Sequence, residues 1–153
     1  ILGHSGLGGD NFYPVSATTI EESSICFVEQ GMLFKLMKKN SMLSIRMMMF
    51  YANELNRSEA KVKSISQMTV RERVVDTLLY IHRKFNDNKG FLNLTLSRRE
   101  YADYAGTTEE QVIQIFSCLK KENLIHTKGK KIGISNLNLL KKEISEHNFY
   151  LDL

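Results

Sequence analysis

One stretch of twenty residues decides the fold: Ser97–Phe116, which reads SRREYADYAGTTEEQVIQIF. It begins with a capping box, because Ser97 is followed three residues later by Glu100. The short helix that this box starts is expected to end at Gly106, a residue type common just past helix C-termini. A longer helix is expected over residues 108–123. A glycine turn this tight sets the two helices at a steep angle, so the stretch predicts a helix-turn-helix.

Signals on both sides of this stretch complete a winged helix. Two further capping boxes precede helical periodicity, Thr69…Glu72 before this stretch and Thr107…Glu110 within it. A turn cluster at residues 86–90 precedes an alternating apolar stretch that is typical of a strand. The predicted elements are a helix over 70–85, a strand over 91–96, helices over 98–105 and 108–123, hairpin strands over 124–127 and 131–134, and a last helix from Asn136 to Ile144. The fold class is therefore mainly α with a small β component.

The composition is that of an ordinary soluble protein. Of the 153 residues, 42% are hydrophobic and 25% charged, and only one is proline, which excludes a disordered chain. No apolar run reaches the roughly 18 residues of a transmembrane helix, so we expect no membrane partner. Cys26 and Cys118 are too few for a disulfide framework and lack metal-ligand spacing. We expect both to be buried apolar residues in a reducing cytoplasm.

The sequence contains no recognisable catalytic arrangement. It has no paired-carboxylate site, no nucleophile with a supporting histidine and no glycine-rich phosphate loop in the right context. We therefore predict neither catalytic residues nor a metal site. The net charge is +4, distributed as −1 over residues 1–40, +2 over 41–69 and +3 over 70–153. A charge this modest permits nucleic-acid binding, and the positions of the basic residues matter more than their number.

Residues 41–66 contain neither glycine nor proline and predict one long helix. Apolar residues recur along it at spacings of three, four, three and seven, a coiled-coil-like seam of Ile45, Met48, Ala52, Leu55 and Val62. A second apolar set lies elsewhere around the helix: Met47, Phe50, Tyr51 and Ile65. About 25 helical residues span roughly 38 Å, too long to be buried in so small a domain. We favour a seam between two copies of the chain, and packing of both faces against one domain stays an open alternative.

The helix-turn-helix is suited to place its longer helix in the major groove of DNA. Polar residues at the start of that helix fit base edges, since Glu accepts from the cytosine amino group and Gln pairs with adenine; they are Thr108, Glu109, Glu110, Gln111 and Gln114. Phosphate contacts are expected from nearby cations and helix N-termini, at Ser97, Arg98, Arg99, Thr107, Ser117, Lys128 and Lys130. Two plainer interpretations stay open: the glutamates complement the helix dipole, and the hairpin lysines are solvated charge.

Residues 41–135 resemble the dimerisation helix and DNA-binding domain of the Crp–Fnr family of bacterial transcription regulators. TVRERVVDTLL at 69–79 resembles the first helix after the family's hinge, and LSRREYADYAG at 96–106 resembles its T-R-Q-E-I-G-x-x-V-G stretch. EEQVIQ at 109–114 matches the register of its recognition helix, and LKKENLI at 119–125 matches the exit from that helix. The resemblance implies a homodimer on a two-fold-symmetric DNA site, a pivot at 66–69, and RNA polymerase as a further partner.

The recognition helix departs from the family's pattern. Members commonly carry Arg-Glu-x-x-x-Arg or Glu-x-x-Ser-Arg there. In this sequence only Glu110 matches, while Glu109 replaces the first Arg and Gln114 the last. Because a bidentate Arg is the usual reader of guanine, we predict a target unlike the common TGTGA and TTGAT half-sites.

The first residues bear on sensing. Residues 25–28 (ICFV) predict a buried strand. By the resemblance, residues 1–40 look like the end of a cyclic-nucleotide-binding-like β-roll sensor, residues 41–68 like the dimerisation helix and hinge, and residues 69–153 like the winged helix-turn-helix. Cyclic-nucleotide members use a Gly-Glu-Leu motif and an Arg-Ser pair, whereas Gly3-His4-Ser5 and Tyr13-Pro14 stand near those places here. Without that Arg a phosphate lacks a bidentate partner, so we do not expect cyclic-nucleotide binding, and the effector stays unknown.

The predicted function is transcription regulation through DNA binding by a homodimer. The alternative is a winged-helix module that binds proteins without specific DNA readout. Ile113, an apolar residue among the polar positions of the recognition helix, is the one feature that favours this alternative.

Overall fold

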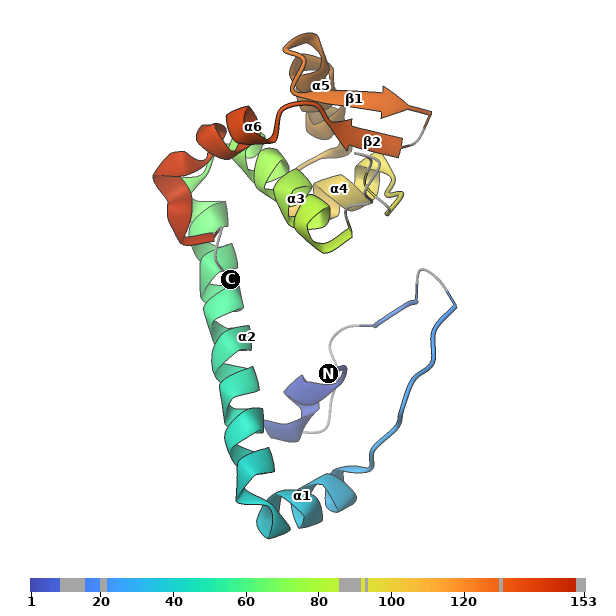
Figure 1. Cartoon of the computed structure of the whole chain (residues 1–153), viewed down its shortest axis with the longest axis vertical. Coiled ribbons are helices and arrows are strands. Elements are labelled where there is room, and N and C mark those ends of the chain that lie inside the picture. The colour runs from blue at the N-terminus through green and yellow to red at the C-terminus, as the bar shows by residue number, and fades with distance from the viewer. Residues whose placement is uncertain (9–15, 20–21, 86–91, 93, 130, 151–153) are drawn as a thin grey trace. The chain divides into compact units, whose positions relative to one another are not determined.

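Helices dominate the computed structural model of the chain, and the residues that it describes include one small antiparallel sheet, which confirms the predicted fold class (Figure 1). The structure describes residues 1–8, 16–19, 22–85, 92, 94–129 and 131–150. They fall into two units, Ile1–Asn53 and Glu54–Leu153. The division at residues 40 and 68 stays a prediction. The elements are η1 (His4–Gly8), α1 (Gln30–Lys39), α2 (Ser41–Gln67), α3 (Val70–Phe85), α4 (Arg98–Ala105), α5 (Glu109–Lys121), β1 (Ile125–Lys128), β2 (Lys131–Ile134), α6 (Leu137–Glu143) and η2 (Ser145–Tyr150).

In the first unit, the strand expected over residues 25–28 does not form. These residues have no regular structure, and Phe27 is 90% exposed. Both Cys26 and Cys118 are exposed as well, so the expectation that they are buried is wrong. A strand is stable only beside other strands, and the described residues of this unit include none.

The helix α1 was not expected from the sequence. Its N-cap residue, Glu29, makes no side-chain hydrogen bond to the helix, so no capping signal marked its start. Asn40 separates α1 from α2 and accepts a hydrogen bond from the Leu43 N–H at 3.2 Å. The Ser44 hydroxyl donates back to the Met37 carbonyl at 2.9 Å, which holds the corner between the helices.

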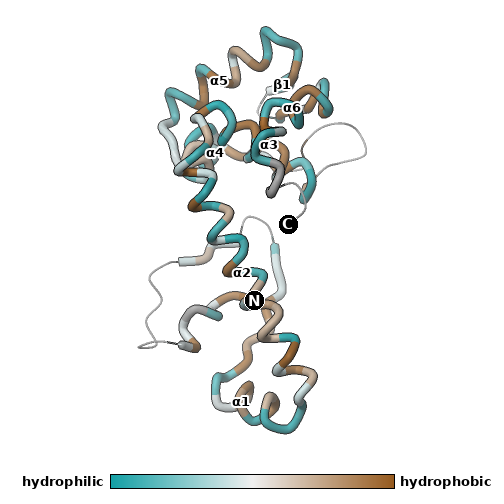
Figure 2. Tube along the Cα trace, turned by 90° about the vertical axis from the view of Figure 1, so that its left-hand side faces the viewer, coloured by the Kyte–Doolittle hydropathy of each residue, from teal (hydrophilic) through white to brown (hydrophobic). Residues whose placement is uncertain are grey.

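The first half of α2 packs on η1 through Phe50 and Tyr51 of its second apolar set. The His4 ring meets the rings of Phe50 and Tyr51 edge-on, with centroids 5.2 and 5.9 Å apart. The Tyr51 hydroxyl donates to the His4 carbonyl at 2.9 Å, and Met47 is buried. The long helix is confirmed as one continuous element, and hydropathy alternates along it (Figure 2). Among the described residues, no helix is long and apolar enough to cross a membrane.

In the second unit, α3, α4, α5, the hairpin and α6 surround a single apolar core. Its fully buried members come from every one of these elements and include Val74, Leu78, Tyr101, Val112, Leu119, Ile125, Ile132 and Leu140. The helix α3 spans residues 70–85 as predicted, and Asn136 caps α6 by accepting from the Leu139 N–H at 3.1 Å. The core therefore takes the apolar stripes predicted for α3 and α5.

The hairpin pairs Ile125 with Ile134 and Lys128 with Lys131. The strand expected over 91–96 is wrong at the described positions 94–96, which have no strand structure. What remains there is a bridge at Leu92, a buried residue whose N–H donates to the Ile132 carbonyl at 2.9 Å. The expected turn over 86–90, Tyr13-Pro14 and Lys130 lie outside the described residues.

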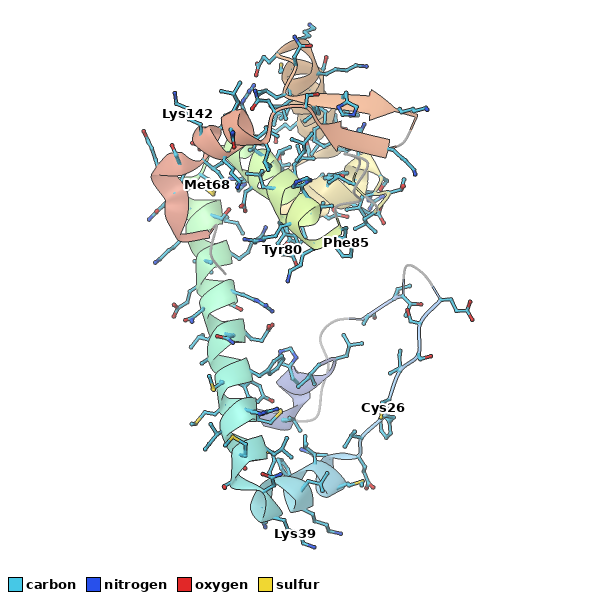
Figure 3. All side chains as sticks on the ribbon, in the orientation of Figure 1. Cys26, Lys39, Met68, Tyr80, Phe85 and Lys142 are labelled. Carbon is cyan, nitrogen blue, oxygen red and sulfur yellow. The ribbon has the colours of Figure 1, made fainter. Side chains whose placement is uncertain are left out.

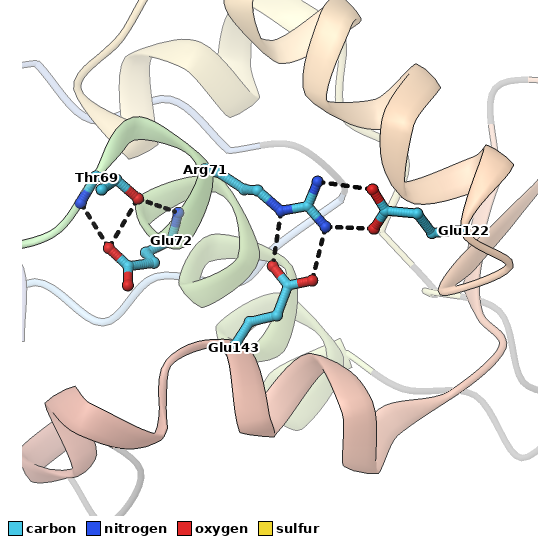
Figure 4. A network of polar contacts seen from close by, with 5 residues as sticks. All are labelled: Thr69, Arg71, Glu72, Glu122 and Glu143. Atoms are coloured by element: carbon cyan, nitrogen blue, oxygen red, sulfur yellow. Dashed lines mark hydrogen bonds and ion pairs between the residues drawn. The ribbon is translucent and has the colours of Figure 1, made fainter.

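A charged network joins three helices of this unit (Figure 4). The Arg71 guanidinium on α3 donates to both oxygens of Glu143 on α6, at 2.9 and 2.7 Å. It also donates to both oxygens of Glu122 at the end of α5, one of them at 3.1 Å. These hydrogen bonds raise the pKa of Arg71 and lower that of Glu122. Beside them, the predicted capping box forms, because the Thr69 N–H donates to Glu72 at 2.7 Å and the Glu72 N–H to the Thr69 hydroxyl at 3.3 Å.

Replacing Arg71 with Met is expected to lower the midpoint of thermal unfolding by several degrees, because two carboxylates lose their shared cation. The side chain is one-third exposed, so we expect a loss of about 1–2 kcal/mol, between the values for exposed and buried pairs. Glu143→Gln should cost more than Glu122→Gln, since the Glu143 side chain is 23% exposed and the Glu122 side chain 46%. Far-UV circular dichroism measures the midpoints, with Lys120→Met on the exposed face of α5 as control. Equal midpoints for all four variants would contradict a stabilising role for the network.

Candidate nucleic-acid interface

The short helix α4 begins and ends where the sequence predicts. The Ser97 N–H donates to the Glu100 carboxylate at 2.6 Å, and the Glu100 N–H donates to the Ser97 hydroxyl at 3.2 Å. The capping box is therefore complete. Gly106 ends the helix with φ 65° and ψ 49°, the left-handed conformation in which its N–H reaches back to the last turn.

The capping box predicted at Thr107 and Glu110 is wrong by one residue. Thr108 is the N-cap of α5, and its hydroxyl accepts from the Gln111 N–H at 3.4 Å. Thr107 instead closes the turn, because its N–H donates to the Ala102 carbonyl at 3.0 Å. Its hydroxyl donates to the Gln111 side-chain oxygen. The turn includes Thr107, which the capping-box pattern had assigned as the N-cap. The helix α5 therefore starts one residue later, at Glu109.

The helix α5 has one buried and one exposed face. Val112, Phe116 and Leu119 are buried in the core. The five residues predicted to read bases are all exposed: Thr108, Glu109, Glu110, Gln111 and Gln114. Ser117, predicted to contact a phosphate, is exposed as well. Ile113 is 51% exposed among them, so this polar face also carries an apolar side chain. Hydrogen bonds from the Glu110 backbone and the Thr108 hydroxyl lower the pKa of Glu110, which keeps it anionic at the helix start.

The predicted phosphate-binding cations differ in their surroundings. The Arg98 guanidinium lies 4.5 Å from the centroid of the Phe116 ring and is partly buried, so packing takes up one of its faces. Arg99, next to it on α4, is exposed. Lys128 is exposed at the end of β1, while Lys130 lies outside the described residues. Among those residues, no group of His, Cys, Asp and Glu side chains could hold a metal ion.

Arg73 on α3 is a positioning residue that the sequence did not reveal. Its guanidinium donates to the Ala105 carbonyl at 2.9 Å and to the Gly106 carbonyl at 3.1 Å, both at the turn before α5. A third hydrogen bond, at 3.1 Å, reaches the Met68 carbonyl just after α2. All three acceptors are backbone atoms, and two of them are more than 30 residues away in the sequence, so no local pattern marks them.

Comparison with known proteins gives a consistent result. Residues 72–143 match the family model described as the Crp-like helix-turn-helix domain. The transcriptional activator protein Anr of Pseudomonas aeruginosa is 28% identical over 138 residues, which cover 88% of this chain and 56% of that protein. The fumarate and nitrate reduction regulatory protein of Vibrio cholerae is 26% identical over 140 residues, which cover 89% and 55%. The chain thus spans about half the length of the curated relatives it matches.

A solved structure agrees with the fold. FixK2 from Bradyrhizobium japonicum superposes with a TM-score of 0.71 at 27% sequence identity, over 75% of this chain and 58% of that chain. The match extends beyond the residues of the family model. It therefore supports the helix-turn-helix in the context of the elements around it.

The turn between α4 and α5 gives a test of local backbone constraint. Gly106→Ala is expected to destabilise the second unit by about 1–2 kcal/mol, because an L side chain in the left-handed region is strained. An added Cβ would lie 3.9 Å from Ile65, an ordinary contact, so the cost is conformational and not steric. The control is Gly31→Ala on α1, where the Cβ meets nothing within 4 Å and alanine favours a helix. Urea unfolding measures both, and equal effects would contradict the role of the left-handed turn.

Proposed function

We propose that the chain, whose residues 72–143 match the Crp-like helix-turn-helix domain, is a regulator of the Crp–Fnr type that binds double-stranded DNA as a homodimer and regulates transcription. The observation that carries this proposal is the exposed polar face of α5, which follows a tight left-handed turn and begins at the exposed N-cap residue Thr108. A helix presented in this way fits the major groove, with its first residues at the base edges. The role is that of a regulator and not of an enzyme, acting in the cytoplasm.

The base readout would rest on side chains other than arginine. Glu110 is anionic and exposed, so it can accept from a cytosine amino group, and Gln114 one turn later can pair with adenine. Ile113 lies between them on the same face and offers an apolar contact to a thymine methyl group. Glu109 and Gln111 complete the polar rim. The exposed Ile113 also favours the second candidate function, a module that binds protein partners.

Affinity would come from contacts to the phosphates on either side of the groove. Arg99 and Lys128 are exposed cations on α4 and β1 that can reach phosphates. The N–H groups of Ser97 and Thr107 already donate to Glu100 and Ala102, so these two residues would act through the positive helix ends beside them. Arg98, Ser117 and Lys130 complete the proposed set. Arg98 is partly held by Phe116, so we expect it to contribute less than Arg99.

The dimer would form along the seam of α2. Ile45, Met48, Leu55 and Val62 are 46%, 67%, 60% and 66% exposed in the single chain, and Ala52 is exposed as well. Apolar side chains repeated at this spacing on an uncovered helix need a partner. A second copy supplies one around a two-fold axis, and two recognition helices then match a two-fold-symmetric site. RNA polymerase is a further proposed partner, and the segment 66–69 the proposed pivot.

Binding selection on random duplexes tests the proposal as a whole. The chain is expected to select two related half-sites about 10 base pairs apart, neither of them TGTGA or TTGAT. Gln114→Ala should relax the preference at one position by about 1–3 kcal/mol. Lys128→Ala should weaken binding to all sequences and reduce the salt slope by about one, while the exposed control Lys39→Ala leaves it unchanged. Failure to enrich any sequence would favour the protein-binding module instead.

The seam is tested separately by sedimentation equilibrium. Leu55→Glu is expected to weaken self-association at least about tenfold, because each dimer loses two apolar contacts and gains two charges at the seam. The matched control is Leu139→Glu, since Leu139 is a 49% exposed leucine on α6, away from the seam. A monomer at all concentrations for the unmodified chain, or equal masses for both variants, would exclude this dimer.

A further inference from the structure

A cavity of about 330 Å³ lies within the second unit, apart from the exposed face of α5. Its wall is formed by the last turns of α2, by α3 and by the end of α4. Small-molecule sites in proteins have volumes of about 300–1,000 Å³, so this cavity is large enough for a small ligand. No step of the proposed DNA recognition uses it.

The cavity has an excess of positive charge. Four basic and two acidic residues line it, and the most buried of the cations is Lys61 on α2. The Lys61 ammonium donates to the Tyr104 carbonyl at 2.5 Å and lies 4.5 Å from the centroid of the Tyr104 ring. Burial lowers the pKa of Lys61, which Asp76 partly opposes. One of the three N–H donors of an ammonium serves this carbonyl, and the others leave it capable of holding an anion.

A buried hydroxyl faces the same cavity. Ser64, one helical turn after Lys61 on α2, is 2% exposed and lines the cavity wall. Its hydroxyl oxygen has no hydrogen-bond partner among the residues that the structure describes. Buried polar groups in native proteins are nearly always satisfied, by protein, water or ligand. An unpaired donor one turn from a half-buried cation is the arrangement that an oxyanion completes.

The tyrosines make this wall rigid. The rings of Tyr80 on α3 and Tyr104 on α4 stack with their centroids 5.3 Å apart and their planes 20° from parallel. Tyr80 lies on the side of α3 that faces α2 (Figure 3). Lys61 rests on the Tyr104 ring of the pair, so its ammonium is held at a fixed place. Of the two carboxylates of the wall, Glu54 pairs with Arg57 at 2.5 Å. Burial raises the pKa of Asp76, and its charge interacts with Lys61 and Arg83.

We propose that this cavity is a binding site for a small organic anion, a carboxylate or a phosphate ester. Its oxyanion would pair with Lys61 and accept a hydrogen bond from Ser64, next to the stacked tyrosines. The proposal does not rest on DNA binding, because every residue that carries it lies away from the α5 face. It also differs from the cyclic-nucleotide site of the sensor domain, which the resemblance places in other residues.

Nuclear magnetic resonance titration of the full chain tests the site in the absence of DNA. The probes are inorganic phosphate and acetate, with glycerol as the uncharged control. The amide signals of Lys61, Ser64 and Tyr104 are expected to shift saturably with a Kd on the order of 10 mM or lower for the anions, and to stay in place with glycerol. The proposal would be overturned by shifts confined to Arg99 and Lys128, by equal shifts with glycerol, or by no shifts at all. If there are no shifts, a bound water is the partner of the Ser64 hydroxyl.

Two substitutions separate ligand binding from folding. Lys61→Met keeps the length of the side chain and is expected to weaken anion binding at least about tenfold, while Lys63→Met, two residues away on the same helix, leaves it unchanged. Ser64→Ala should weaken binding about fivefold and raise the thermal midpoint of the free chain, because it removes an unpaired buried hydroxyl. Unchanged anion affinity in Lys61→Met or in Ser64→Ala would overturn the assignment.

Discussion

The second unit depends on one guanidinium, that of Arg73, which holds the backbone where the helices meet. It donates to the carbonyl after α2 and to two carbonyls at the turn before α5. An arginine can do this because its planar head carries five donors in a fixed geometry, whereas a lysine offers a single point charge. The direction of α5 is thereby tied to the end of α2 through one rigid group. Any displacement at the end of α2 must break a hydrogen bond or carry the turn with it.

The helix α3 is the centre of this arrangement. Arg71 and Arg73 stand two residues apart, which on a helix places them on different sides. Arg71 reaches the end of α5 and α6, while Arg73 reaches the start of the turn before α5. Both ends of the proposed recognition helix are therefore fixed from one element. The apolar core of the unit sets how closely the helices pack against one another. Arg71 and Arg73 set the position of α5 relative to α3.

Local signals in the sequence predicted most of this unit, and the failures have a common cause. Ser97, Gly106 and Asn136 act within four residues of themselves, so their roles could be predicted from spacing. The start of α5 was predicted one residue too early because the Thr107 N–H donates to the Ala102 carbonyl. This hydrogen bond belongs to the turn and not to α5. In the first unit, the prediction of a strand over residues 25–28 was wrong because a strand forms only beside other strands. The hydropathy of the segment does not show whether such strands are present. Arg73 was missed for the same reason, since its acceptors are carbonyls that every residue carries.

The charges of the proposed interface explain why dimerisation and DNA recognition would belong to one chain. Glu109 and Glu110 suit the positive end of the α5 dipole, yet they would repel phosphates, so this end of the helix would add little non-specific affinity. The net charge of residues 70–153 is only +3, so the attraction of this segment to DNA would be modest. One winged helix would then bind a half-site weakly. Two copies joined along α2 would bind the second half-site at a high effective concentration, and the product of two modest affinities would become sufficient. Acidic residues at the proposed recognition helix would thus favour selectivity, and the proposed α2 seam would restore the affinity that they give up.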